Sequence, residues 1–258
     1  MARSRRYREA AALIDPERSY PPAEAIALVK KASGAGFDEA IELHARLGVN
    51  VRHAEEQLRG TLALPSGIGK DVTVVAFAEG DQANAATEAG ADHVGGADLV
   101  AKVEEGWTDF DVVVATPAMM PEVSKLGRVL GPQGKMPNPK VGTVTDDVAK
   151  AVGEAKAGKV EYRTDKQAIV HLTIGRSSFS EEALLQNYAA VIDELVRSKP
   201  SSAKGRYLVS VSLSPSMGPG VRVDTTLTRA AEILDAAGTA VTEAVADASE
   251  PAEAPVEA

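Results

Sequence analysis

The sequence predicts two fold classes in one chain: strand–helix mixtures of α+β type at both ends, and an α/β unit with a parallel, Rossmann-like sheet between them. First, the central stretch alternates apolar runs with helical patterns in βαβα order. Second, its apolar runs are nearly continuous, as in strands covered on both faces, whereas strands near the ends alternate apolar and polar residues. Third, the chain has 258 residues, which at roughly 150 residues per domain suggests two domains.

The first segment predicts two helices and a strand. Residues 3–14 have the pattern of a basic helix that ends at Asp15-Pro16, and residues 22–32 that of a helix with one apolar face. Residues 37–49 alternate as a strand with one wet face. Its apolar side comprises Ile41, Leu43, Ala45 and Leu47. We place Arg52 and Arg59 in the polar connection that follows.

The central segment predicts alternating strands and helices. The expected strands are 71–78, a short one near 93–94, and 111–115; the expected helices are 81–89, 97–105, 121–130 and 146–157. Asp146 and Asp147 suit the N-terminus of the last helix, where negative charge is favourable. Trp107 beside Phe110 is interpreted as core rather than as a stacking platform.

The last segment predicts two paired strands, 159–163 and 168–174, joined by a four-residue turn. A long amphipathic helix follows, capped by Ser180 and ending near Ser198. Residues 206–213 alternate again, and 221–223 begin a final short strand. The tail, 229–258, is acidic and rich in alanine, so we expect disorder after one or two helical turns.

The net charge of -9 is unevenly distributed. Residues 1–66 with 159–228 hold 19 Lys and Arg against 16 Asp and Glu, residues 67–158 hold 8 against 14, and residues 229–258 hold 1 against 7. The two outer segments are therefore mildly basic. Such a pattern suits a nucleic-acid-facing domain made from both ends of the chain, because neutralising phosphates favours the basic module.

Several classes of function find no support. The chain has no cysteine, its four histidines lack metal-ligand spacing, and no nucleophile elbow appears. We therefore predict no enzyme, no metal and no cofactor. No apolar run approaches the ~20 residues that cross a bilayer, and the basic N-terminus lacks the apolar core of a signal peptide. These features predict a cytoplasmic protein without membrane partners.

The most distinctive stretch is GRVLGPQGKMPNPKVGTVT, residues 127–145. Its prolines fix φ and its glycines allow unusual backbone angles, so an ordered surface loop is expected. It is either a structural connector or a phosphate or nucleic-acid contact. A nucleotide-binding P-loop is excluded, since Val129 stands where a glycine is needed and Met136 where Ser or Thr is needed. GIGK at 67–70 fails similarly, and no Rossmann GxGxxG occurs.

This stretch closely resembles the signature of the family of the universal large-subunit ribosomal protein L-one, the stalk protein beside the tRNA exit site. The resemblance continues through RGTLALPSGIGK, AGADHVGG, FDVVVATPAMM and SMGPGVRV, and covers roughly residues 1–225. It implies a discontinuous α+β RNA-binding domain, residues 1–66 and 159–228, interrupted by an inserted α/β domain, residues 67–158. Two crossings between the domains would form a hinge.

The resemblance also implies a function. The protein would be part of the 50S ribosomal subunit and bind the stalk region of 23S rRNA. It would assist movement and release of exit-site tRNA, and repress translation of its own operon by binding that mRNA. The residues implied as RNA contacts are Ser216, Met217, Gly218, Pro219 and Ser210, followed by Phe37, Glu42, Lys166, His171 and Lys204. Secondary RNA or tRNA contacts are Arg128, Lys135 and Lys140.

The sequence departs from the family pattern at three positions. Gly36 stands where lysine is common, Ala40 where a hydroxyl residue is common, and Ser66 where histidine is frequent. Two rival functions remain. The α/β domain could be an enzyme that binds a phosphorylated ligand with its loop, and the acidic tail could belong to a protein-interaction module.

Overall fold

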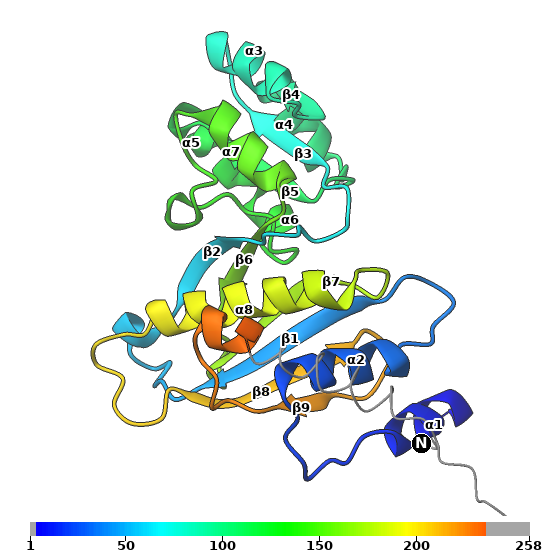
Figure 1. The fold of residues 1–258 in the computed structure, drawn as a ribbon. Helices are drawn as coiled ribbons and strands as arrows, with labels where there is room; N and C mark the ends of the chain where they lie inside the picture. The colour runs from blue at the N-terminus through cyan, green and yellow to red at the C-terminus, as the bar shows by residue number, and fades with distance from the viewer. Residues whose placement is uncertain (1–3, 236–258) are drawn as a thin grey trace, which may run out of the picture.

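The structure, a computed structural model, describes residues 4–235, apart from the side chains of residues 54 and 140. Its helices are α1 (Arg5–Ala12), α2 (Pro22–Ala32), α3 (Asp81–Glu88), α4 (Ala97–Glu104), α5 (Met120–Val123), α6 (Gly127–Leu130), α7 (Val148–Lys156) and α8 (Glu181–Arg197). Its strands are β1 (Ala40–Leu47), β2 (Arg59–Ala63), β3 (Val74–Phe77), β4 (His93–Gly95), β5 (Val112–Ala115), β6 (Lys159–Arg163), β7 (Ile169–Arg176), β8 (Leu208–Pro215) and β9 (Val221–Val223). Figure 1 shows two bodies joined by β2 and β6.

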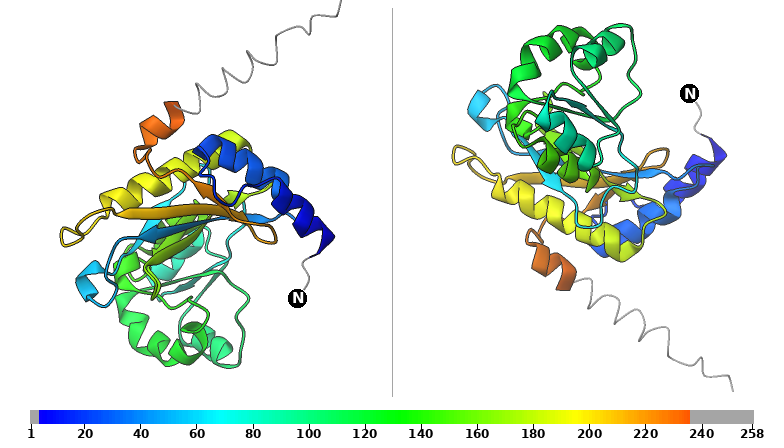
Figure 2. Two further views of the ribbon diagram at one scale, coloured as in Figure 1. Left: turned by 90° about the horizontal axis from the view of Figure 1, so that it is seen from below. Right: turned by 90° about the horizontal axis from the view of Figure 1, so that it is seen from above.

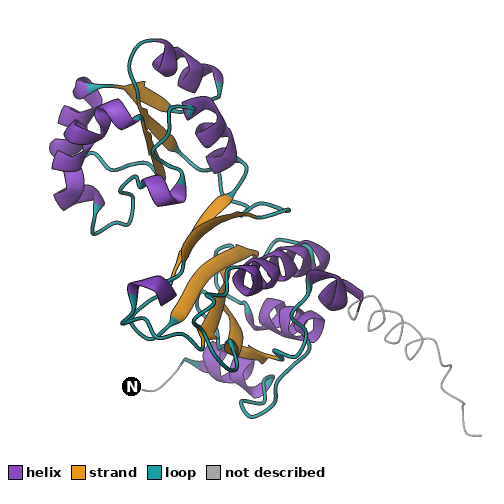
Figure 3. Ribbon diagram, turned by 90° about the vertical axis from the view of Figure 1, so that its left-hand side faces the viewer, coloured by secondary structure: helices purple, strands orange, loops and turns teal. Residues whose placement is uncertain are grey.

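The larger sheet is antiparallel, with the strand order β7-β1-β8-β9. On β1, His44 lies opposite His171 of β7 and opposite Ser212 of β8. Strands that precede and follow the central stretch are therefore neighbours in one sheet. Helices α2 and α8 contact each other and pack on the same side of this sheet, as Figures 2 and 3 show. The expected apolar side of β1 is buried against them, with Ile41, Leu43 and Ala45 all 0% exposed.

The smaller sheet is parallel, with the order β4-β3-β5, as expected for the central segment. Val74–Phe77 is buried along its whole length, because helices cover both faces. Val75 and Phe77 pack in a cluster with residues of α4, α5 and α6, whereas Val74 and Ala76 pack in a cluster with residues of α3 and α7. Trp107 packs against the first of these clusters beside Phe110, which confirms its role in the core.

A two-stranded ribbon of β2 and β6 connects the two bodies. The predicted pairing of 159–163 with 168–174 is therefore wrong along β6, and only the turn end of the hairpin forms, through the antiparallel bridge between Thr164 and Val170. Arg59 is likewise not in a polar connection but starts β2, where its side chain pairs with Glu161 at 2.7 Å. β6 pairs instead with β2, which lies far away in the sequence. Local sequence patterns do not predict such a long-range pairing.

The predicted helix at 121–130 is also wrong in its continuity. Residues 117–130 form successive short turns: a 3₁₀ turn (Pro117–Met119), α5, a second 3₁₀ turn (Ser124–Leu126) and α6. Within this segment Ser124 donates its hydroxyl hydrogen to the carbonyl of Met120 at 2.7 Å. Such side-chain bonds compete with the regular helical ladder, and Gly127 adds backbone freedom. The loop that follows is closed by a further 3₁₀ turn (Pro139–Val141).

The last described residues pack against the larger body. Residues 230–235 are helical, and Ile233 is 1% exposed within the core cluster beneath the four-stranded sheet. The acidic segment therefore does not separate from this body directly after residue 228. The rest of the predicted tail, 236–258, lies outside the described residues. Among the described helices, none has the length and apolar character that a membrane crossing needs.

Candidate nucleic-acid interface

The four-stranded sheet has one open face, on the side away from α2 and α8. Because side chains alternate along each strand, the residues between the buried ones share this face. It carries a mixture of hydroxyl, imidazole and charged groups, none of them buried: Glu42, His44 and Arg46 from β1, His171 and Thr173 from β7, Ser210, Ser212 and Ser214 from β8, and Arg222 from β9. Small polar groups on a pleated surface can be approached closely by a polynucleotide backbone.

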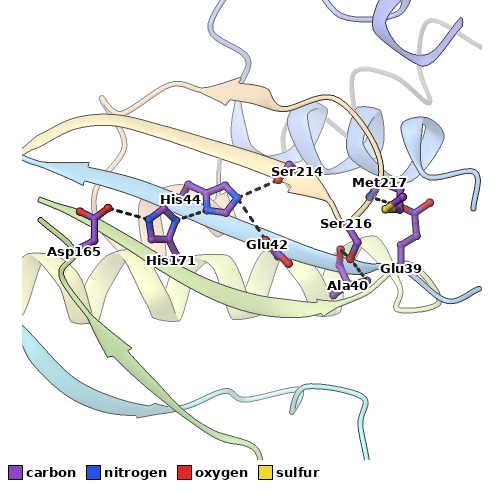
Figure 4. A network of polar contacts seen from close by, with 9 residues as sticks. All are labelled: Glu39, Ala40, Glu42, His44, Asp165, His171, Ser214, Ser216 and Met217. Atoms are coloured by element: carbon purple, nitrogen blue, oxygen red, sulfur yellow. Dashed lines mark hydrogen bonds and ion pairs between the residues drawn. The ribbon is translucent and has the colours of Figure 1, made fainter. Parts of the chain in front are cut away.

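A chain of imidazoles crosses the middle of the open face (Figure 4). Nδ1 of His44 lies 2.8 Å from Nδ1 of His171, and Nε2 of His44 lies 3.1 Å from the hydroxyl of Ser214. Nε2 of His171 lies 3.5 Å from the carboxylate of Asp165. Burial lowers the pKa of His44, and the neighbouring His171 lowers it further, while Glu42 opposes both. The two rings hold each other in fixed orientations on adjacent strands.

A buried carboxylate organises one end of the same face. Glu39 is 1% exposed, and it accepts the backbone N–H groups of Gly34 at 2.9 Å and Ala35 at 2.7 Å. Its second oxygen accepts the N–H of Met217 at 2.9 Å, as Figure 4 shows. Burial by itself raises the pKa of Glu39, but these three N–H donors and the charge of Arg6 outweigh it and keep the pKa below its usual value.

The turn between β8 and β9 is fitted closely to the start of β1. Ser216 accepts the N–H of Ala40 at 3.2 Å through its hydroxyl, and its own N–H donates to the carbonyl of Ala40 at 3.0 Å. A Cβ on Gly218 would lie 2.5 Å from a side-chain carbon of Pro215. Pro219 is buried within this turn, and its predicted RNA contact stays a prediction.

Two large apolar side chains project from this end of the sheet. Phe37 is 57% exposed in the loop before β1, and Met217 is 56% exposed in the turn after β8. Glu39 ties the backbones that carry them, because its carboxylate bonds both the 34–35 segment and residue 217. Exposed side chains of this size cost free energy in water and suit contact with a partner, such as stacking of a base on Phe37.

The opposite end of the sheet is cationic. Arg46 is exposed on β1 and pairs in register with Ile169 of β7 and Ser210 of β8. Lys166 is exposed in the turn that leads into β7, and Lys204 is exposed in the loop that leads to β8. Of the predicted residues, Glu42, His171 and Ser210 therefore lie on the open face itself. Five others are exposed in the loops and turns at its two ends: Phe37, Lys166, Lys204, Ser216 and Met217.

The loop at 127–145 belongs to the other body. Lys135 donates to the carbonyl of Thr108 at 3.0 Å and lies 5.1 Å above the ring of Phe110, so its charge is engaged inside this body. Arg128 is exposed. The side chain of Lys140 is outside the described part of the structure. Thr143 fixes the loop by accepting the N–H of Asn138 at 2.8 Å. The described cations of the loop, Arg128 and Lys135, belong to this body and not to the open sheet face.

Sequence reasoning missed part of this surface. Arg46 and His44 lay on the predicted wet face of β1 but were not selected, and Ser214 continues the alternation of β8 beyond the predicted end at 213. No local signal distinguishes Glu39 from its neighbour Asp38, which is exposed and binds Ser177 and Ser178. Among the described residues, no three His, Cys, Asp or Glu side chains are grouped to hold a metal ion.

Comparisons with known proteins agree with the resemblance in the sequence. The model of the ribosomal protein L1p/L10e family matches residues 28–219. The protein named large ribosomal subunit protein uL1 from Corynebacterium urealyticum is 55% identical over 224 residues, which cover 87% of this chain and 94% of that protein. The region matched by the family model includes the open-face residues on β1, β7 and β8, the turn at 216–218 and the loop at 127–145.

Proposed function

The chain belongs to the ribosomal protein L1p/L10e family, which is not an enzyme family, and we propose from this premise that it is a structural component of the large ribosomal subunit that binds 23S rRNA directly. The observation that supports the proposal is the open sheet face together with the exposed loops at its ends, which carry most of the residues implied as RNA contacts. Its cellular place would be the ribosome in the cytoplasm, and its work would need no cofactor.

We further propose that the two bodies are domains with separate tasks. Residues 1–66 and 159–228, extended through the packed segment to 235, would form the RNA-binding domain. Residues 67–158 would form an inserted α/β domain that extends the stalk surface. The ribbon of β2 and β6 is the covalent link on both crossings, so bending of this ribbon would change the angle between the domains.

The open face suits RNA better than a purely basic patch would. Its hydroxyl groups and exposed backbone near Ser216 can meet ribose 2′-hydroxyls and phosphates, which are the groups that distinguish an RNA surface. Phe37 and Met217 add apolar contact at one end, where unstacked bases can pack. The cations Arg46, Lys166 and Lys204 at the other end supply phosphate neutralisation.

Two regulatory roles follow from the family premise. As part of the stalk, the protein would assist movement and release of tRNA at the exit site. The same face would repress translation of its own operon when it binds an mRNA segment shaped like the ribosomal site. On the inserted domain, the exposed guanidinium of Arg128 would contact the tRNA. Lys135 is less suited to this contact, because its ammonium group already donates to the carbonyl of Thr108.

The experiment is a binding titration of the purified protein with an RNA fragment of the ribosomal stalk, at several salt concentrations. Met217→Asp places a negative charge at the proposed interface, whereas Leu13→Asp places the same charge at a similarly exposed apolar position, 54% exposed, in the segment after α1. We expect tight, salt-sensitive binding by the wild type, a large loss for Met217→Asp, and near-wild-type binding for Leu13→Asp.

Each outcome has a definite meaning. Equal binding by Met217→Asp and the wild type would move the interface away from this turn. A flat affinity between low and high salt would contradict phosphate contact. Absence of RNA binding by a folded wild-type protein would overturn the proposed function, and saturable nucleotide binding in equilibrium dialysis would then favour the enzyme alternative.

A further inference from the structure

A cationic depression lies beyond the edge strand of the open face. Its volume is about 550 Å³, and it is lined by Val51, Arg52, Gln57, Arg163, Thr164, Asp165 and Lys166. These residues come from three separate places: the loop after β1, the end of β6, and the turn into β7. The depression adjoins the imidazole chain, since Asp165 contacts His171 at 3.5 Å (Figure 4).

The positive charge in this depression is available to a ligand. Arg52, Arg163 and Lys166 are all exposed, and none of them forms a salt bridge within the described residues. The nearby pair of Arg59 and Glu161 is already mutually satisfied at 2.7 Å. Three unpaired cations gathered around one hollow repel each other, so an anion placed among them is favoured.

The carboxylate in the lining is committed to the backbone. One oxygen of Asp165 accepts the N–H groups of Gln167 and Ile169, both at 2.8 Å, and the other oxygen faces His171. The N–H of Ile169 is the main cause that lowers the pKa of Asp165, and burial opposes it only partly. Asp165 therefore stays charged, but hydrogen bonds within the turn and to His171 occupy its oxygens. Because three cations line the hollow against this one carboxylate, the hollow has a net positive charge.

The turn that carries Lys166 is firmly built. Besides the bonds to Asp165, the N–H of Ala168 donates to the carbonyl of Asp165 at 3.2 Å, and Ala168 has a φ of 60°. A non-glycine residue in this left-handed region is held there by its surroundings. On the facing side, Gln57 donates to the carbonyl of Val51 at 2.9 Å and fixes the loop of Arg52. The three cations are therefore presented by ordered backbone.

We propose that Arg52, Arg163 and Lys166 form a phosphate clamp that binds the RNA backbone where it leaves the open sheet face. The ligand class is a phosphodiester, for which the planar guanidinium forks are suited because each can donate two parallel N–H···O bonds. The inference rests on the proposed RNA-binding function. It extends the interface around the β7 edge, toward the ribbon that joins the two bodies.

The test measures binding of the stalk RNA fragment by the wild type and by three variants. These are Arg163→Ala, Arg163→Lys, and a double variant that carries both Arg52→Ala and Arg163→Ala. Lys125→Ala is the matched control, because it removes one exposed positive charge from the other body. Each lost phosphate contact should weaken binding roughly threefold to tenfold and lower the slope of log K against log salt by about 0.7 to 0.9. Arg163→Lys should keep most of the slope but lose affinity, since an ammonium lacks the fork.

The outcomes separate the clamp from the function on which it rests. Slopes identical to the wild type in both alanine variants, with tight wild-type binding, would overturn the clamp and leave the proposed function standing. Equal losses in Lys125→Ala would show a general charge effect and also overturn the clamp. Thermal shifts with inorganic phosphate at fixed ionic strength give a second arm: stabilisation that needs Arg163, together with unchanged RNA slopes, would reassign the hollow to a free anion. No RNA binding by the wild type would overturn both proposals.

Discussion

The buried carboxylate of Glu39 and the backbone N–H of Met217 are joined by a hydrogen bond of 2.9 Å. The two residues lie far apart in sequence, on loops at the same end of the four-stranded sheet. Because the other oxygen of Glu39 accepts two N–H groups of the 34–35 segment, one side chain sets the spacing between the backbones of Phe37 and Met217. The apolar end of the proposed interface is therefore preorganised by a residue that a partner does not touch.

Glu39→Gln tests this positioning. The glutamine oxygen can still accept from Gly34 and Ala35, but its NH₂ group then faces the N–H of Met217, so two donors oppose each other. We expect a loss of about 1–3 kcal/mol in the free energy of unfolding, because a buried donor is left unsatisfied. RNA affinity should fall as the turn at 216–218 shifts. Denaturant titration and RNA binding measure the two effects.

The matched control for Glu39→Gln is Glu24→Gln, which removes the same charge from an exposed ion pair with Arg18. Exposed pairs contribute little, so its stability should stay within about 1 kcal/mol of the wild type. If both variants bound RNA as tightly as the wild type while Glu39→Gln lost stability, Glu39 would be a purely structural residue and the positioning role would be wrong.

Phe37→Ala should separate binding from folding. The ring is more than half exposed, so its removal should change the free energy of unfolding by no more than about 0.5 kcal/mol. RNA affinity should drop by about 1–3 kcal/mol if a base stacks on the ring. Leu13→Ala, at 54% exposure, is the control with equal apolar exposure and no proposed contact. Equal RNA affinity in the two variants would exclude stacking on Phe37.

The histidine pair predicts a pH dependence of stability. The pKa of His44 is lowered by burial and by His171, so the unfolded chain binds this proton more tightly than the folded protein does. The resulting stability is fully present above the unfolded pKa of about 6.5 and is lost as the pH falls through the lower folded value. Urea midpoints measured between pH 7.5 and 5 should therefore decrease on acidification.

His44→Gln should flatten this dependence because it removes the titrating ring. Glu42→Gln provides the complementary comparison: Glu42 raises the pKa of His44, so its removal should lower that pKa and extend the loss of stability to more acidic pH. A wild-type dependence that persists unchanged in His44→Gln would assign the effect to other groups.

Local sequence patterns predicted most single elements but not how they meet. The N-cap of α8 could be predicted, because Ser180 accepts the N–H of Ala183 in a short-range hydrogen bond with a known sequence signature. The parallel sheet could be predicted from the sequence, because strands that are buried on both faces are continuously apolar. The pairing of β2 with β6 could not be predicted, since each strand has only five residues and its partner lies about a hundred residues away.

The same distinction holds for the candidate site. Residues such as Met217 and Ser216 were selected through family resemblance, and both are exposed in the turn after β8. Glu39 was missed because its role depends on burial by loops that are distant in sequence. The burial of Pro219 was not predicted, because sequence does not show which side of a turn faces the solvent. The cationic hollow was not predicted from the sequence for a similar reason. Arg52 and Arg163 come together only when β2 has paired with β6.

Gly218→Ala tests the close fit of the turn. The added Cβ would lie 2.5 Å from a carbon of Pro215 and 3.3 Å from the carbonyl of Ala32, so the turn must move. We expect a destabilisation of about 1–3 kcal/mol and weaker RNA binding. Gly36→Ala is the control, because no atom lies within 4 Å of its added Cβ. Equal stability of the two alanine variants in denaturant titration would contradict the tight packing of this turn.

Two truncations test where the larger body ends. Ending the chain after residue 229 removes Ile233, which is 1% exposed in the core cluster, and should cost about 2–5 kcal/mol of stability. Ending it after residue 235 keeps Ile233 and removes only the last segment, which carries five Asp and Glu and no Lys or Arg. That shorter deletion should leave stability unchanged and leave RNA affinity equal or slightly higher, because a stretch with the same charge sign as RNA is gone. A collapse of RNA binding on the shorter deletion would mean that residues 236–258 contribute to the interface, and equal stability of both truncations would remove Ile233 from the core that supports the sheet.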